Sequence, residues 1–170
     1  NDVDALATAK ENLANDYNDT YNNLSNTYLD LPAVTVGAQN ALYGYDFDSR
    51  KSQWNMDVLS NLFTTQDPSM LAFKDKAKAD YMASKTAYDA SVAAYAQISR
   101  SGSTDALDQI LSQSIDMTTA VAQALQSELN FFGSISDLSK TNNVALPSAF
   151  STLQSTTRAH LTTANSDLST

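Results

Sequence analysis

Three tyrosines recur at intervals of seven residues near the middle of the chain, and a small residue precedes each of them by four positions. The tyrosines are Tyr81, Tyr88 and Tyr95, and the small residues are Ala77, Ser84 and Ser91. An interval of seven keeps side chains on one face of a helix, and alternating large and small residues let that face pack closely on a neighbour. The pattern therefore predicts a long helix that packs along its length against other helices.

Both ends of the chain carry apolar stripes with the same spacing. The first stripe consists of Val3, Leu6, Leu13, Tyr17, Tyr21, Leu24, Tyr28 and Leu31, and the last of Phe150, Leu153, Thr157, Leu161, Ala164 and Leu168. The stripes are already under way at the first residues and still running at the last, with no initiator Met and no cap on the final helix. We therefore expect residues 1–170 to form a single helical domain that is an insert of a larger protein.

The amino-acid composition limits the fold class of the chain and the kinds of partner that it can bind. With 4 Gly and 3 Pro in 170 residues, a few long elements are favoured over many short strands, and 42% hydrophobic residues suit a folded domain. The absence of Cys excludes a disulfide framework and a thiolate metal site. A net charge of −9 with scattered basic residues excludes nucleic acid as a partner. No apolar run is long enough for this segment to insert into a membrane.

Helix boundaries follow from proline, glycine and capping residues. The residue before a proline is pushed out of the helical region, so the first helix is expected to stop before Leu31-Pro32. Asp67-Pro68 is a typical helix start, Ser101-Gly102 is a break, and either Ser103 or Thr104 can cap the helix that follows. The expected helices span 2–30, 32–44, about 52–63, 67–99, 104–140 and 147–170. They predict an all-α fold: an elongated up-down-up-down four-helix bundle, coiled-coil-like, with two short capping helices.

This topology places both termini at one end, beside the Ser101-Gly102 turn. The opposite end, the tip, is then built from residues 32–67 and the loop 141–146. Six aromatic residues gather around the expected short helices: Tyr43, Tyr45, Phe47, Trp54, Phe63 and Phe73. The first five are the candidate partner contacts at the tip. They are interpreted either as a small core that closes the bundle or as a contact surface for a protein partner, because exposed aromatic side chains mark interfaces.

No residue pattern points to catalysis, a cofactor or a metal. His160 is the only His and has no carboxylate beside it in sequence, so we expect a half-exposed bundle residue rather than part of a triad. Asp46, Asp48 and Asp57 have the spacing of a calcium loop, but Arg50 and the lack of the required Gly break the motif. A turn and capping role is expected for these Asp residues. The chain is therefore predicted not to be an enzyme.

Several segments together resemble a known family. They are Ala9-Lys10-Glu11-Asn12-Leu13, the run from Asp16 to Leu24, Leu29-Asp30-Leu31-Pro32, Ser52-Gln53-Trp54-Asn55-Met56-Asp57, and the stretch from Lys78 to Asp89. This texture resembles the helical insert of HlyD-like membrane fusion proteins, the periplasmic adaptor subunits, in a divergent form found in candidate-phylum bacteria. The family's tip motif for docking an outer-membrane channel does not occur at the predicted tip.

The resemblance implies a non-catalytic structural and interaction module of a membrane-transport or secretion adaptor. It implies an extracytoplasmic location, periplasmic or at the cell surface, with tethering to the membrane through the parent protein. The implied partners are proteins, namely an inner-membrane transporter complex and further copies of the chain. Two alternatives share the bundle architecture: an extracytoplasmic sensor domain of the chemoreceptor kind, and a module of a surface stalk.

Overall fold

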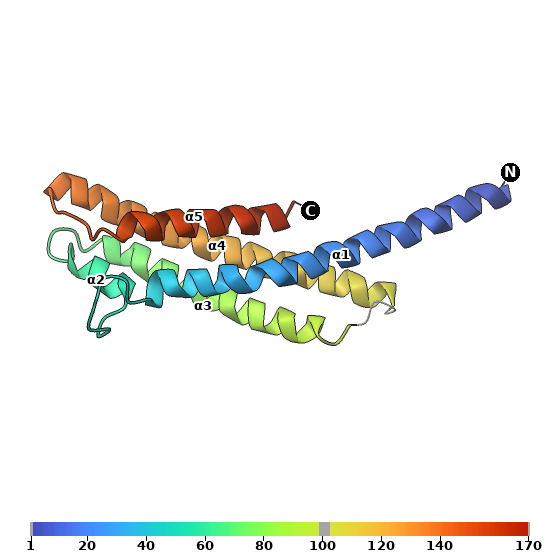
Figure 1. Cartoon of the computed structure of the whole chain (residues 1–170), viewed down its shortest axis with the longest axis horizontal. Coiled ribbons are helices and arrows are strands. Elements are labelled where there is room, and N and C mark those ends of the chain that lie inside the picture. Colours follow the sequence, from blue (N-terminus) through green and yellow to red (C-terminus); the bar gives the residue numbers. More distant parts are fainter. Residues whose placement is uncertain (1, 99–102, 170) are drawn as a thin grey trace.

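The computed structural model describes residues 2–98 and 103–169, which form four long helices and one short one (Figure 1). The helices are α1 (Asp2–Tyr43), α2 (Asn55–Asn61), α3 (Met70–Tyr95), α4 (Thr104–Asn142) and α5 (Phe150–Asp167). No strand occurs in the described ranges, so the predicted all-α class is confirmed.

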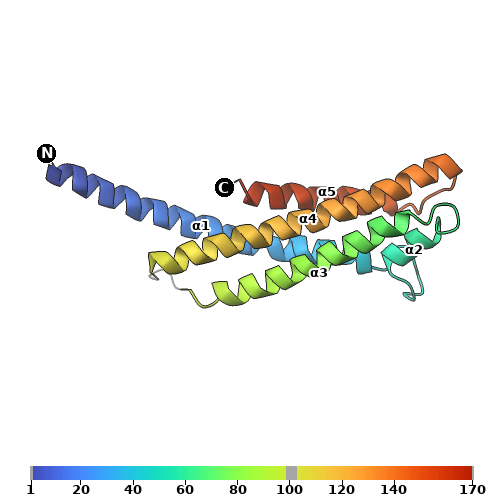
Figure 2. The same cartoon turned by 180° about the vertical axis from the view of Figure 1, so that it is seen from behind.

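The four long helices run in alternating directions. Helix α4 contacts α1, α3 and α5, and α1 also packs along α5 (Figures 1 and 2). Helix α2 sits at one end, against α1 and α3. This arrangement is the predicted up-down-up-down four-helix bundle. The largest fully buried side chains are Phe63, Phe131, Phe132, Leu31, Leu42, Met56, Leu59, Met70, Met117, Leu125, Ile135 and Glu128.

The tyrosine stripe of α3 lies at the boundary with α1, as its spacing predicts. Tyr95 stacks on Tyr28 of α1 with ring centroids 4.0 Å apart, and the Tyr28 hydroxyl is hydrogen-bonded to the Ser91 hydroxyl. Ser91 is buried, and its small side chain leaves room for the phenol that reaches across from α1. Tyr81 is itself buried in the core. The large-against-small alternation is therefore a device for close helix packing.

The predicted helix break at Leu31-Pro32 is wrong. Helix α1 continues through Pro32 to Tyr43, so only one short capping helix, α2, is present instead of two. Pro32 removes one backbone hydrogen bond from the helix, but it lies on the exposed face, where water can satisfy the freed Tyr28 carbonyl. On the opposite face Leu31 and Val34 are buried in the core. Packing on both sides of Pro32 outweighs the local cost.

The remaining helix ends lie within a few residues of those predicted. Ser103 caps α4 as expected, since its hydroxyl oxygen accepts a hydrogen bond of 3.3 Å from the Ala106 amide. Asp67 and Pro68 form a turn before α3, which begins at Met70. Helix α5 likewise begins at Phe150 rather than Pro147. The predicted Ser101-Gly102 turn and the last residue of the preceding helix lie outside the described residues.

The two ends of the bundle differ in outline. The first turn of α1 and the last turn of α5 point away from α2, and α1 projects well beyond α5 (Figure 1). Residues 2–16 are exposed on every face. At the α2 end, the loop 44–54, α2 and the α4–α5 connection close the bundle. The described helices contain no stretch that is both apolar enough and long enough to cross a membrane.

Candidate interaction surface

The loop 44–54 carries two exposed aromatic residues, Tyr45 and Trp54, and Asp48 organises the loop. The Asp48 carboxylate accepts hydrogen bonds from the amides of Arg50, Ser52 and Gln53 and from the Ser52 hydroxyl, at 2.7 to 2.9 Å. These bonds, the Ser52 hydroxyl first among them, lower the pKa of Asp48 to about 2. Asp48 therefore has the turn role that the sequence predicts, and the loop has a defined shape.

A buried asparagine ties this loop to the end of α1. The Asn55 side-chain oxygen accepts a bond of 2.8 Å from the Asp46 amide, and its amide group donates to the Asn40 carbonyl at 3.0 Å and to the Asp46 carboxylate at 2.7 Å. Gly44 makes this approach possible: a Cβ there would lie 2.4 Å from the Asn40 carbonyl oxygen and 2.8 Å from the Asn55 side-chain nitrogen. The loop is thus anchored at both of its ends.

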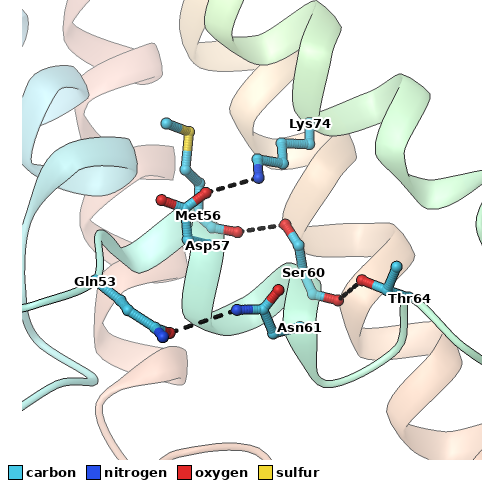
Figure 3. A network of polar contacts seen from close by, with 7 residues as sticks. All are labelled: Gln53, Met56, Asp57, Ser60, Asn61, Thr64 and Lys74. Atoms are coloured by element: carbon cyan, nitrogen blue, oxygen red, sulfur yellow. Dashed lines mark hydrogen bonds and ion pairs between the residues drawn. The ribbon is translucent and has the colours of Figure 1, made fainter.

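Helix α2 is fixed to its surroundings by polar contacts (Figure 3). Lys74 of α3 and Asp57 form a partly buried ion pair of 2.7 Å. The Ser60 hydroxyl donates to the Met56 carbonyl, and the Thr64 hydroxyl donates to the Ser60 carbonyl at 2.8 Å. Since Asp57 pairs with Lys74, the three Asp residues of the calcium-loop spacing have separate tasks. No group of metal-binding side chains is found among the described residues.

Two of the five aromatic residues predicted as partner contacts form an exposed pair. Tyr45 and Trp54 are each 41% exposed, and the indole Nε1 of Trp54 donates a hydrogen bond of 3.1 Å to the Tyr45 hydroxyl. Phe47 is half-buried against the core. Phe63 is fully buried and offers no surface. The cluster is therefore divided between the two interpretations, with Phe63 closing the core and Tyr45 and Trp54 facing solvent.

Tyr43 connects the exposed pair to the core. Its ring meets the Trp54 ring edge-on, with centroids 5.1 Å apart, and lies 5.4 Å from the ring of Tyr81 on α3. Burial raises the pKa of Tyr43, and the nearby Tyr81, Asp57 and Glu128 raise it further. Burial also raises the pKa of Tyr81. We call Tyr45, Trp54, Tyr43 and Tyr81 the aromatic ladder.

Glu128 of α4 lies close enough to Tyr43 and Tyr81 to raise the pKa of both, and sequence reasoning missed it. It is fully buried, and neither carboxyl oxygen has a hydrogen-bond partner among the described residues. Burial raises the pKa of Glu128 well above its usual value. The signal was present: Val121, Leu125, Glu128, Phe132 and Ile135 follow one another in steps of three and four.

His160 has the half-buried position that its place in the last helix predicts. It packs on the backbone of α1 at Gly37, where a Cβ would lie 2.2 Å from the His160 Nε2. Burial lowers the pKa of His160. The role that the structure shows for His160 is therefore one of helix packing.

The chain was compared with known protein families, curated proteins and solved structures. No protein-family model, no curated protein and no solved structure matches the chain. The surface that the structure presents is an exposed tyrosine–tryptophan pair on an anchored loop, connected through aromatic contacts to the buried Tyr81. Such a surface can bind through ring contacts and through the polar edges of the rings.

Proposed function

We propose that the chain is a non-catalytic interaction module of a membrane-transport or secretion adaptor, and that it contacts a protein partner through the exposed pair Tyr45 and Trp54. The observation that carries this proposal is the placement of the pair on an anchored loop at the α2 end. The free ends of α1 and α5 point the other way (Figure 1). An elongated bundle with its contact surface at one end suits a part that spans the distance between two components.

The exposed pair has the properties of a contact surface. Tyr and Trp are enriched at protein interfaces because a rigid ring contributes a large contact area together with a polar group. The Trp54–Tyr45 hydrogen bond and the edge-on contact with Tyr43 hold the indole in one orientation. A side chain that is already ordered loses little conformational entropy on binding. The Asp48 turn and the Asn55 anchor extend that order to the backbone.

Site-specific photo-cross-linking tests this proposal. A photoreactive amino acid replaces Trp54 in the protein as its own cell makes it, and cross-linked products are identified by mass spectrometry. The matched control replaces Met82, an apolar residue on α3 that is 53% exposed and lies outside the loop. We expect a defined membrane-transporter component in the Trp54 product and not in the Met82 product. The proposal is wrong if position 54 yields no product beyond those of position 82, or only products with a second copy of the chain.

A further inference from the structure

Glu128 is a fully buried acid that the proposed contact surface does not explain. A carboxylate at this position has lost its hydration without gaining a hydrogen bond, because neither oxygen has a partner among the described residues. The neutral acid is therefore the form that the folded core favours, in agreement with the raised pKa. Burying a titratable group without a partner costs stability. A functional role would account for the presence of Glu128 on the apolar face of α4.

The groups around Glu128 offer no compensating positive charge. Tyr43 of α1 and Tyr81 of α3 are the titratable groups that it influences. Three lysines of α3 have acidic partners: Lys74 is paired with Asp57 of α2, Lys85 with Asp89, and Lys76 with Asp80, which also accepts a hydrogen bond from Ser127. On α5, His160 packs at Gly37. Burial alone sets the direction of the Glu128 pKa shift.

The aromatic ladder leads from the two tyrosines that Glu128 influences to the surface. Two ring contacts, of 5.4 Å between Tyr81 and Tyr43 and of 5.1 Å between Tyr43 and Trp54, lead to the hydrogen bond between Trp54 and Tyr45. Packed cores do not deform smoothly, so a displacement at one contact is passed to the next. A displacement of Tyr43 or Tyr81 therefore reaches the exposed pair through rings in direct contact, and Glu128 lies close enough to both tyrosines to act on them electrostatically.

We propose that Glu128 is a proton switch for the contact surface. In the protonated form, Tyr43 and Tyr81 pack over the neutral acid and hold Trp54 in its edge-on position. When the proton leaves to solvent, the carboxylate requires water, and the rings of Tyr43 and Tyr81 move to admit it. Trp54 then loses its support and the surface loosens. This inference rests on the proposed function for the identity of the contact surface.

The direction of the pH dependence follows from the raised pKa. Between the unfolded and the folded pKa values, the unfolded chain has lost the Glu128 proton while the folded protein still holds it. The packed form is thus most favoured at low pH and is progressively lost as pH rises through the folded pKa of Glu128. The partner that Trp54 contacts is accordingly bound more tightly on the acid side.

The fluorescence of Trp54 tests the switch directly, because Trp54 is the only tryptophan. Emission and acrylamide quenching are recorded on the full chain from about pH 5 to about pH 9, below the range in which an ordinary tyrosine titrates, with circular dichroism to show that the helices persist. We expect a one-proton transition with a red shift of the emission maximum and increased quenching. Glu128→Gln, which is nearly isosteric and cannot ionise, abolishes this transition.

Glu11→Gln is the matched control, since Glu11 and Glu128 are the only two glutamates and Glu11 is exposed. We expect it to keep the transition. His160→Asn, the second control, is also expected to keep it. The switch is excluded if the folded wild-type protein shows no transition, or if the transition survives Glu128→Gln or disappears with His160→Asn. The photo-cross-linking at position 54, done at one pH, tests the contact surface independently, so either idea can fail alone.

Discussion

Around α2, apolar side chains from α1, α2, α3 and α4 meet in one core, whereas the apolar side chains in the first turns of α1 are exposed. Phe63, Leu59 and Leu42 are fully buried at the α2 end. Val3 and Leu6 near the start of α1 are 70% and 57% exposed. Both regions belong to helices with the same apolar spacing, and in α1 they belong to one continuous helix. The spacing shows which face of a helix is apolar, and tertiary contacts decide whether that face is covered.

The polar contacts differ in the same sense. At the α2 end, Asn55 is fully buried and its side chain makes three hydrogen bonds to the loop and to α1. In the first part of α1, side chains such as Thr8 and Thr20 bond only to carbonyls one turn back in their own helix. Long-range bonds restrict the fold, and local ones do not. Four predictions use this contrast.

Truncating an apolar side chain at each end gives the largest difference. We expect Phe63→Ala to lower the free energy of unfolding by about 3–5 kcal/mol, because it removes a fully buried ring and leaves a cavity. The matched Leu6→Ala change at an exposed site is expected to stay within about 0.5 kcal/mol. Urea denaturation measures both. Equal effects at the two positions would mean that the two regions are not packed differently.

Removing the buried acid is expected to stabilise the protein. Glu128→Leu takes away an unpartnered carboxyl and is expected to raise the free energy of unfolding at neutral pH by about 1–3 kcal/mol. Because the folded pKa is raised above the ordinary 4.5, wild-type stability is greatest below that value and falls as pH rises towards the folded pKa. Glu128→Leu lacks this fall, while Glu11→Leu keeps it. Denaturation midpoints over a pH series decide the point; a loss of stability in Glu128→Leu at every pH would contradict the assignment.

Substitutions at Gly37 and His160 test the packing between α1 and α5. We expect Gly37→Ala to lower the free energy of unfolding by about 1–2 kcal/mol, because the new Cβ overlaps the His160 ring. In a His160→Ala background most of this cost should disappear, since the ring is absent. A double-mutant cycle measures the coupling. Additive effects of the two substitutions would show that the two residues do not touch.

Protonation of Asp48 is expected to have the smallest effect of the four changes, and one confined to the loop 44–54. Its folded pKa of about 2 lies below the ordinary 3.8, so the stabilisation of the loop is present above 3.8 and is lost as pH falls through about 2. Because Asp48 lies in the loop 44–54 and is only half-buried, we expect the loop to change without global unfolding. Carboxyl chemical shifts of Asp48 and amide shifts of Ser52 and Gln53 follow this by NMR. In Asp48→Asn the acid transition of those amides should be missing; a transition that persists would assign it to another group.

Much of the fold could be predicted from residue spacing and helix signals. The tyrosine heptad placed α3 beside a neighbouring helix, and Ser103 marked the start of α4. The Leu31-Pro32 prediction was wrong because proline preference is local, whereas Leu31 and Val34 pack across the whole bundle. Of the candidate surface, the sequence indicated the group of aromatic residues but not their division. Phe63 is buried and Trp54 exposed, although both are large, apolar and close in the chain.

The sequence by itself determined the helical class, the number of long helices and the face of each that is apolar, because helix periodicity and capping are properties of neighbouring residues. Only the tertiary structure decided which apolar faces meet, that α1 passes through Pro32, and that Tyr45 and Trp54 stay at the surface. It also decided the environment of Glu128. Burial raises the pKa of a glutamate only when residues from other helices enclose it, and no local pattern fixes which residues those are.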